Sequence, residues 1–472
     1  MNDEALLRES KVQLEALDAP SLRRLGLLPL DGSFFPAIYY PPLTKYPACD
    51  AKKLLEDIGS NAAVQAALYI HIPSCKTRCT YCHWVVTLGD SPADMDVYLD
   101  HLEKEMELWG RMLGRRLAPG SILIGGGTPS ILPSAQMRRL MRAVTSRFDL
   151  SGCLQFSFEV EPTTVLGREG LEKLSILKDH GVDRISMGVQ FLNDDVLKRM
   201  GRPHASADAL AAVANVRRAG FESLSIDLIY GSPGSTPGNW LRTLRSAQAA
   251  GVDAYQLYRL RIEPHGDKKG AVHAQFQRVP DSFPALEQVY LMKELGVLFS
   301  EQNGYKENFR RIFSRSPRHI SYYLRDYCCR LRDVVGMGIS SWSNVQGRLA
   351  LNTGHSLKRY YAAISAGRLA IDRGLRRTEE DEKRWAFVLP LKSYGVSKIR
   401  YREAVGAEAD AVFGKKIKMM KATGLLEDDA TRVALTRRGQ FFADEVCMQF
   451  YEPKFLPFPQ TAYSKGPLNP YR

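Results

Sequence analysis

Segments with strand and helix patterns alternate strictly between about residues 68 and 262. The expected strands are runs of apolar residues, as in sheets that helices cover on both faces. The segments between them repeat apolar residues at helical spacing, and Asp94 is a candidate cap for the first such helix. Strands joined by helical crossovers lie parallel, so the pattern predicts an α/β fold. The strands are LYIHI, SILIGGG, LQFSFEVEP, DRISMGVQ, LSIDLIYGSPG and DAYQLYRLRI.

The number of expected strands narrows the architecture further. Six strands fall short of the eight of a closed barrel, so right-handed crossovers predict a partial (β/α)6 barrel of the TIM type. In such a sheet, ligands bind at the carboxyl ends of the strands. The unusual motifs of this chain all fall at those ends.

The alternation stops beyond Gly270, which suggests three parts. We expect an N-terminal arm over 1–60, the barrel with an extension over 61–370, and an accessory domain over 371–472. The accessory domain begins with helices and continues into GLLEDDATRVALTRRG, a hairpin pattern, so a small helical domain of winged-helix type is predicted. Its tail is rich in proline and aromatic residues and is expected to lie extended on the surface.

Composition points to a soluble, cytoplasmic protein. No apolar run reaches the ~18 residues that a membrane span needs, and the charged N-terminus lacks the apolar core of a signal peptide. The eight cysteines would then be reduced, which argues against a disulfide framework.

The net charge of +13 is concentrated between residues 305 and 332. This basic segment is either a solvated loop or a docking surface for an anionic or carrier-linked small-molecule substrate. No nucleic-acid-binding module accompanies the charge, so nucleic acid is not the expected partner. The cations are Lys306, Arg310, Arg311, Arg315, Arg318, Arg325 and Arg330.

Three cysteines, Cys75, Cys79 and Cys82, crowd into the loop after the first strand. Clustered cysteines in a reducing compartment are typical of metal sites. Zinc would need a fourth ligand, for which His71 and His83 are the local candidates. A [4Fe–4S] cluster held by three thiolates would leave one iron open to a substrate or cofactor. The remaining cysteines are isolated, or adjacent to each other, and do not suggest a second cluster.

The stretch YIHIPSCKTRCTYC resembles the radical S-adenosylmethionine (SAM) enzymes, in their oxygen-independent coproporphyrinogen III oxidase-like branch. The resemblance extends from about Tyr69 to Ser343 and, more weakly, to LTRRGQFF. Six motifs in the same order make a chance match improbable. Besides the cysteine stretch, the motifs are GGGTPS, FEVEP, RISMGVQ, IDLIYGSPG and VVGMGISSWS.

The resemblance implies roles for individual residues. The three cysteines would ligate a [4Fe–4S] cluster whose open iron binds SAM, and reductive cleavage of SAM would give a 5′-deoxyadenosyl radical. A reductant such as flavodoxin or ferredoxin is then implied as a partner. For the polar residues around SAM, a structural ion pair is the alternative. The residues expected to contact SAM are Tyr69, Tyr81, Gly125, Gly126, Gly127, Thr128, Glu159, Gln190, Arg202 and Asp227.

The reaction is harder to predict from the same motifs. The decarboxylase of this branch carries another cysteine two residues after the triplet, where this chain has Trp84. The pattern CHW is most similar to the class C methyltransferases and cyclopropanases, so we expect transfer of a SAM-derived carbon to an sp2 carbon. Oxidative decarboxylation, heme degradation and a heme chaperone are the alternatives.

In that class two SAM molecules bind side by side. The second would lie against Ile229, Gly336 and Gly338, where glycine lets the backbone approach a ligand closely. Proton handling is expected from one of four residues near the strand ends, and for His83 a simple packing role is the alternative. These catalytic candidates are His83, Tyr69, Tyr258 and Glu263.

Overall fold

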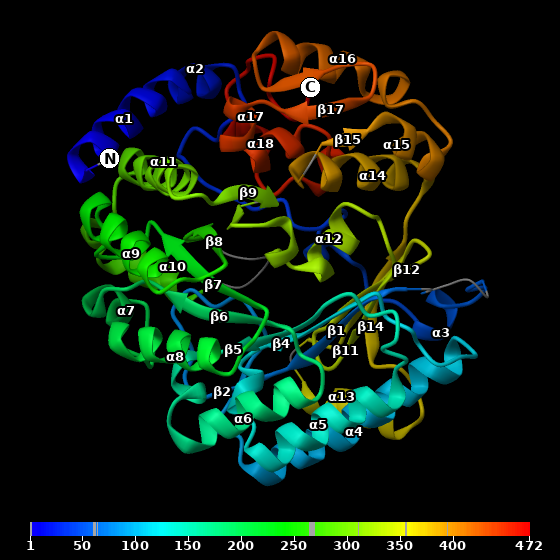
Figure 1. Ribbon diagram of the computed structural model, residues 1–472. Helices are drawn as coiled ribbons and strands as arrows, with labels where there is room; N and C mark the ends of the chain where they lie inside the picture. The colour runs from blue at the N-terminus through cyan, green and yellow to red at the C-terminus, as the bar shows by residue number, and fades with distance from the viewer. Residues whose placement is uncertain are drawn as a thin grey trace.

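The computed structural model describes residues 2–59, 63, 65–263, 270–309, 311–354, 356–393 and 395–472. One large sheet runs through the molecule, with a helical layer on one side and the C-terminal region on the other (Figure 1). No helix in the described part of the chain is long and apolar enough to cross a membrane.

Six neighbouring strands form the predicted parallel core of the sheet. Their side chains alternate between two faces, and the register places Ile70 beside Ile124 and Glu159 beside Ser186. The α/β partial barrel expected from the sequence is therefore confirmed. In spatial order the strands are β1 (Ala67–Ile72), β4 (Ser121–Gly126), β5 (Phe156–Val160), β6 (Arg184–Gln190), β7 (Ser223–Tyr230) and β8 (Ala254–Arg259).

The connecting helices cover the outer face of these strands. Outward side chains such as Ile70 and Ile124 share one buried cluster with Leu102 and Leu140 of the helices. The first of these helices begins at a capping box in which Ser91, rather than the expected Asp94, is the N-cap, and Asp94 is the third helical residue. The helices are α4 (Pro92–Met112), α5 (Ser134–Arg147), α6 (Gly167–Asp179), α7 (Asp194–Arg199), α8 (Ser206–Arg218), α9 (Pro237–Ala249), α10 (Ala271–Arg278) and α11 (Leu286–Gln302).

Further strands extend both edges of the core. β11 (Val334–Met337) lies parallel to β1, so the parallel part of the sheet has a strand that the sequence pattern did not reveal. Three antiparallel strands follow it, and a hairpin adds to β8 at the other edge, so the twelve-stranded sheet stays open. These strands are β12 (Trp342–Val345), β13 (Arg348–Asn352) and β14 (Ile371–Arg376), with β9 (Lys306–Phe309) and β10 (Ile312–Ser314) in the hairpin; α13 (Leu357–Ser365) precedes β14.

A short segment, residues 317–328, closes the end of the barrel where the strands begin. It contains the turn η5 (Pro317–His319) and α12 (Tyr322–Cys328), and we call it the plug. The Gln155 side chain donates to the Ile320 carbonyl at 2.9 Å, and the Ser121 hydroxyl donates to Asp326 at 2.9 Å. Gln155 and Ser121 lie at the starts of β5 and β4, so the plug occupies the end opposite to the cysteine loop.

The C-terminal region packs over the inner face of the sheet (Figure 1). The predicted hairpin forms from β16 (Leu426–Asp428) and β17 (Arg432–Leu435), joined by β15 (Val396–Ser397). The predicted boundary at residue 370 falls directly before β14, a strand of the large sheet. The helices of the region are α14 (Glu379–Ser393), α15 (Lys398–Val405), α16 (Ala409–Ala422), α17 (Arg437–Phe441) and α18 (Ala443–Met448).

The N-terminal arm connects the barrel to the C-terminal region. It begins with α1 (Asp3–Ala16) and α2 (Ala19–Arg24), continues through the 3-10 turn η1 (Leu43–Lys45), and ends with α3 (Ala51–Leu54). Asp444 accepts a hydrogen bond from the Ala37 amide at 2.7 Å, and Lys392 donates to the Ala37 carbonyl at 2.9 Å. The arm is thereby fixed at its middle by the two side chains of a buried ion pair.

Candidate active site at the cysteine loop

The three predicted cluster ligands lie on a loop that leaves the carboxyl end of β1. The ends of this loop are held together by the short parallel strands β2 (Ser74–Cys75) and β3 (Thr87–Leu88). In its middle, the Thr80 amide donates to the Met200 carbonyl at 3.1 Å, and the Val272 amide donates to the Thr80 carbonyl at 2.8 Å. The loop is therefore pinned between the end of α7 and the start of α10.

The cysteine side chains are half-buried and reduced. Burial raises the pKa of Cys75 to about 11 and also raises the pKa of Cys82, so these thiols need a positive partner in order to ionise. Within the described residues, no three His, Cys, Asp or Glu side chains converge on a single-ion site. A [4Fe–4S] cluster places each thiolate on a different iron, so three ligands spread along one loop fit it better than they fit one zinc ion.

Arg202 connects the cysteine loop to the barrel. Its guanidinium donates to the Cys79 sulfur at 3.1 Å and to the Gly188 carbonyl at 2.7 Å, and it lies 3.4 Å from the Tyr81 hydroxyl. Glu161 lies 3.5 Å from the same guanidinium. The predicted residues Cys79, Tyr81 and Arg202 are thus brought together at the strand ends.

Glu161 and His204 belong to this network, although the sequence analysis assigned them no role. His204 Nδ1 lies 2.8 Å from Glu161, and both side chains are buried. Although burial alone would raise it, hydrogen bonds from His204 and Thr163 lower the pKa of Glu161 below its usual value. Glu161 belongs to the motif FEVEP, and His204 lies two residues after Arg202, so these positions in the sequence could have indicated a role for both.

The glycines of GGGTPS are required by contacts within the protein itself. A Cβ atom on Gly125 would lie 2.5 Å from the Glu159 carboxylate, and one on Gly127 would lie 2.5 Å from the Pro73 carbonyl. Gly126 has a φ of +118° and would place a Cβ atom 2.6 Å from the His71 ring. Thr128 follows directly, and its hydroxyl lies 3.4 Å from the Cys75 sulfur.

Two predicted carboxylates, Glu159 and Asp227, face the inside of the barrel together with Arg184. Burial, followed by repulsion from Asp227, raises the pKa of Glu159 to about 7. Burial also raises the pKa of Asp227 to about 6, although Arg184 and Arg202 oppose this. Arg184 was not predicted; it is buried and donates to the His319 carbonyl of the plug at 3.3 Å. The interior therefore carries charged groups on the path from the plug to the strand ends.

Gln190 and Ile229 lie at neighbouring strand ends. Gln190 is the last residue of β6 and has a φ of +67°, a conformation that costs energy for a residue other than glycine. Such strain is common at ligand sites. The predicted contact of Gln190 with SAM stays a prediction. Ile229 is buried two residues beyond Asp227 on β7.

Tyr69 lies on the inner face of β1, and its hydroxyl is 3.0 Å from His71 Nδ1. Burial lowers the pKa of His71 to about 4, and its other nitrogen lies 3.2 Å from the Val85 carbonyl. His71 is therefore a neutral residue that ties β1 to the far end of the cysteine loop.

Gly336 and Gly338 also touch protein in this structure. A Cβ atom on Gly336 would lie 2.1 Å from the Trp342 carbonyl, and one on Gly338 would lie 2.6 Å from the His71 carbonyl. The Gly338 amide donates to the buried Glu105 at 2.7 Å. Their predicted role in holding a second SAM molecule stays a prediction.

The remaining catalytic candidates fall in two places: His83 and Glu263 lie near Arg261, and Tyr258 lies beside Arg311. His83 is held by a hydrogen bond to the Arg261 backbone, and burial together with Arg261 lowers its pKa to about 4. Tyr258 lies under the Arg311 guanidinium, 5.5 Å from it. Burial lowers the pKa of Arg261 to about 10, and the nearby Glu263 opposes this effect.

The basic segment 305–332 is divided between two places. Arg311 lies at the turn between β9 and β10, whereas Arg318, Arg325 and Arg330 lie in or next to the plug, at the far end of the barrel from the cysteines. The sequence suggested that this segment docks a substrate, but those three arginines lie too far from the strand ends to guide a substrate there. Arg310 lies outside the described residues.

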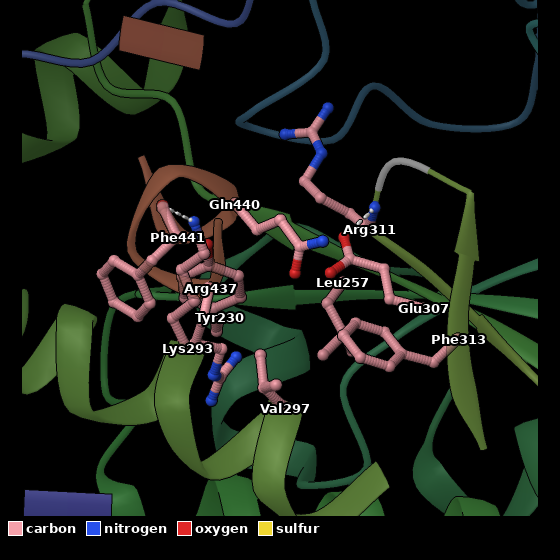
Figure 2. A pocket seen from close by; sticks show the side chains of 10 residues that line it. All are labelled: Tyr230, Leu257, Lys293, Val297, Glu307, Arg311, Phe313, Arg437, Gln440 and Phe441. Atoms are coloured by element: carbon pink, nitrogen blue, oxygen red, sulfur yellow. Dashed lines mark hydrogen bonds between the residues drawn. The ribbon is translucent and has the colours of Figure 1, made fainter. Parts of the chain in front are cut away.

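A cavity of about 20 Å³, room for a single water molecule, lies where α11 meets the hairpin and α17 (Figure 2). Lys293, Glu307, Arg311 and Arg437 line it together with apolar side chains, and the Arg311 guanidinium points away from the others. It is too small for a cofactor and lies away from the cysteine loop. Trp84, on that loop, is 53% exposed.

Comparison with known protein families supports the sequence motifs. Residues 69–247 match the radical SAM superfamily, and residues 391–442 match the HemN C-terminal domain. Heme chaperone HemW of Bacillus subtilis (strain 168) is 31% identical over 389 residues, which are 80% of this chain and 97% of that protein. Oxygen-independent coproporphyrinogen III oxidase of Escherichia coli (strain K12) is 27% identical over 437 residues, 87% of this chain and 92% of that protein.

The solved structures agree with this assignment. Coproporphyrinogen III oxidase (HemN) from Escherichia coli, described as a radical SAM enzyme, aligns with a TM-score of 0.76 and 25% identity. The alignment covers 88% of this chain and 96% of that one, so it includes both the barrel and the C-terminal region.

These relatives correct the predicted reaction. The expected methyltransferase or cyclopropanase activity is wrong, because the relatives are HemW chaperones and coproporphyrinogen III oxidases. The prediction rested on His83 and Trp84 after the third cysteine, and two residues weigh less than a match over most of the chain. The cofactor prediction holds: a [4Fe–4S] cluster and SAM are the cofactors of this superfamily. The chain belongs to the radical SAM superfamily, in the branch that contains oxygen-independent coproporphyrinogen III oxidase and heme chaperone HemW.

Proposed function

We propose that this protein is a radical SAM enzyme that acts on a tetrapyrrole, as an oxidative decarboxylase of the oxygen-independent coproporphyrinogen III oxidase type. The observation that carries the proposal is the alignment with the Escherichia coli coproporphyrinogen III oxidase, which extends over 88% of the chain at a TM-score of 0.76. The HemN C-terminal domain match at residues 391–442 adds support, because it covers the region that packs over the barrel interior.

The residues that would hold the cofactors are placed around the carboxyl end of β1. Cys75, Cys79 and Cys82 would ligate the cluster, and Arg202 and Glu159 would face SAM. When bound, these cofactors supply a carbon-centred radical that removes a hydrogen atom from the substrate. Arg202 is fixed by Glu161 and the Gly188 carbonyl, so a carboxylate that binds it meets a guanidinium already in position.

The barrel itself protects such a radical from water. The plug closes the end where the strands begin, and its Ile320, Tyr323 and Tyr327 are buried. Tyr69 and Ile229 line the interior with apolar surface, and the N-terminal arm lies beside the strand ends. One end of the barrel therefore stays available to the substrate, and this is the end that carries the cysteines.

The proposed decarboxylation releases electrons that an acceptor must take up. For each propionate converted, one hydrogen atom leaves to the radical, and carbon dioxide and one electron leave as the vinyl group forms. The enzyme therefore needs an electron donor for the cluster and a one-electron acceptor for the product step. A redox protein of the flavodoxin or ferredoxin type is the class that we propose for the donor.

The test is anaerobic incubation with SAM, a reductant, an electron acceptor and coproporphyrinogen III. We expect 5′-deoxyadenosine and carbon dioxide in step with loss of propionate groups, measured by mass spectrometry. SAM labelled with deuterium on its methyl group serves as a control: deuterium in 5′-deoxyadenosine would mean that the radical attacks a second SAM. Formation of 5′-deoxyadenosine without loss of propionate would overturn the decarboxylase assignment.

A heme carrier is the second candidate. It is supported by the Bacillus subtilis relative, the heme chaperone HemW, which is 31% identical and 97% covered by this chain. Trp84 also stands where the resemblance places an additional cysteine in the decarboxylase. Stable binding of heme, seen as a visible absorption band, with no conversion of coproporphyrinogen III would favour this candidate.

The second SAM molecule remains part of the proposal. Gly336, Gly338 and Ile229 are the residues proposed to face it, although the two glycines are in contact with Trp342 and His71 here. Equilibrium dialysis of the reconstituted protein with labelled SAM tests this, and a stoichiometry near two per chain is expected. A single bound SAM at saturation would remove this part of the proposal.

A further inference from the structure

Two arginines at the end of β8 are stacked on the N-terminal arm. The Arg259 guanidinium lies 4.8 Å from the Phe34 ring and donates to the Gly32 carbonyl at 3.0 Å. The Arg261 guanidinium lies 4.2 Å from the next ring, that of Phe35. The two contacts lay the arm along the strand end, at the same edge of the barrel as the cysteine loop.

Arg261 also reaches the cysteine loop. His83, which follows the third cysteine, forms a hydrogen bond to the Arg261 backbone. Two cations act on the His83 ring, Arg261 from the strand end and the exposed Arg78 from the cysteine loop. The arm, β8 and the cysteine loop thus meet around Arg261.

The charge at this junction is mainly positive. The loop SCKTRCTYCHW contains Lys76 and Arg78 and no acidic residue. Glu263 lies near Arg261 and opposes its charge. Because Arg261 is partly buried, a ligand that binds it displaces little water, and a charge-assisted hydrogen bond is stronger there than on an open surface.

We propose that Arg261, stacked on Phe35 and beside His83 and Arg78, binds a carboxylate of the substrate and so orients it toward the cysteine loop. The inference rests on the proposed function, which supplies a substrate whose propionate groups carry carboxylates. Stacking uses the face of a guanidinium and carboxylate binding uses its edge, so one arginine can serve both. Arg259 is the positioning residue, because its contacts with Gly32 and Phe34 place Phe35.

The test measures binding of two matched porphyrins to the full chain after anaerobic reconstitution. Coproporphyrin III carries the propionate carboxylates, and its methyl ester has the same ring without these charges. Fluorescence titration gives Kd for each in wild type, Arg261→Gln, Arg261→Lys and the control Arg245→Gln. Arg245 is exposed on α9, where it pairs with Asp3.

We expect Arg261→Gln to weaken binding of the free acid by roughly tenfold or more, the effect of a lost charged hydrogen bond of 1.5–3 kcal/mol. Arg261→Lys should lose less, and ester binding should be the same in all four proteins. Iron content and SAM binding should not change, which separates this role from support of the cluster.

The outcomes distinguish failure of the carboxylate subsite from failure of the proposed tetrapyrrole function. Equal Kd values for the free acid in wild type and Arg261→Gln would overturn the carboxylate subsite and leave the proposed function standing. Equal Kd values of wild type for the free acid and the ester would likewise overturn the subsite and leave the proposed function standing. If wild type binds neither porphyrin, the tetrapyrrole function itself fails, and the subsite fails with it.

Discussion

Arg202 donates a hydrogen bond to the sulfur of Cys79 at 3.1 Å, across 123 residues of sequence. The same guanidinium is held by the Gly188 carbonyl at the end of β6 and lies close to Glu161. The position of one predicted cluster ligand is therefore coupled directly to the barrel interior.

Replacing Arg202 by alanine should destabilise the protein. The change leaves the carboxylate of Glu161 and the carbonyl of Gly188 buried without this partner, and loss of one member of a buried ion pair costs roughly 3 kcal/mol. Urea unfolding of the cluster-free protein measures the free energy. The control Arg138→Ala removes an exposed pair with Glu172 and should change stability by less than about 1 kcal/mol. Equal losses of stability in both variants would show that Arg202 does not form a stabilising buried ion pair.

The cluster should depend on the three loop cysteines alone. Cys79→Ala should lose most of its iron after anaerobic reconstitution, whereas wild type should approach four irons per chain. The matched control is Cys329→Ala, which removes a half-buried thiol beside the plug. Iron and sulfide analysis decides the question. Tightly bound zinc in wild type, or iron loss in the control, contradicts the assignment.

Trp84 should be dispensable for the cluster. Its indole is 53% exposed, and indole nitrogen is only a hydrogen-bond donor, so it is no substitute for a thiolate ligand. Trp84→Phe should retain the iron content and the visible absorption of wild type while its turnover changes. Cluster loss as large as in Cys79→Ala would refute this.

Stability of the cluster-free protein should fall as pH rises from about 4.5 to about 7, in part because of Glu159. Burial and Asp227 raise the pKa of Glu159 from 4.5 to about 7 in the folded state. A carboxyl whose pKa is raised by folding binds its proton more tightly when folded, so its contribution is present at low pH and is lost as pH rises through that window.

The variant Glu159→Gln removes this titration. It should be more stable than wild type at pH 8 by about 3 kcal/mol, with little difference at pH 4, as judged by urea unfolding across that range. Glu427→Gln, in an exposed pair with Arg432, is the control and should follow the wild-type curve. A curve for Glu159→Gln that parallels wild type would contradict the raised pKa.

Lys392→Met should release the N-terminal arm. The change removes the bond to the Ala37 carbonyl and leaves the buried Asp444 with the more distant Arg311, 4.0 Å away, so the arm loses half of its anchor. Chymotrypsin should then cleave at Phe34, Phe35 or Tyr39 several times faster than in wild type. Lys454→Met, which breaks an exposed pair with Glu452, is the matched control. Unchanged cleavage would show that other contacts hold the arm.

The sequence predicted the parts of the fold that are encoded locally. β1 was expected over 68–72 and forms over Ala67–Ile72, and the hairpin near residue 430 forms as β16 and β17. Apolar runs and helical spacing give elements of this kind because neighbouring residues determine them.

Contacts between distant residues were not accessible in this way. Nothing local to Val334–Met337 indicates that it pairs with β1, and nothing in the basic pattern of Arg318, Arg325 and Arg330 indicates a plug. The charge of that segment suggested an exposed surface, whereas His319, Tyr323 and Asp326 are buried.

In the candidate site too, local motifs were predictable and contacts between distant residues were not. Motifs placed Cys79, Tyr81 and Arg202 at one edge of the sheet, and the structure joins them. Arg184 was missed because a single arginine at a strand start has no signature, and its burial depends on the plug. The reaction was predicted wrongly because two residues after the triplet were weighed more heavily than the match of the whole chain.

The anchor of Ala37 has a consequence for the order in which the protein can be completed on the ribosome. Ala37 is bound by Asp444, 407 residues later in the chain, and by Lys392, 355 residues later. The cysteine loop and all the parallel strands are synthesised before either partner of Ala37 exists. During translation the arm therefore lacks this anchor until the last helices emerge, whereas its contacts with Arg259 and Arg261 can form before then.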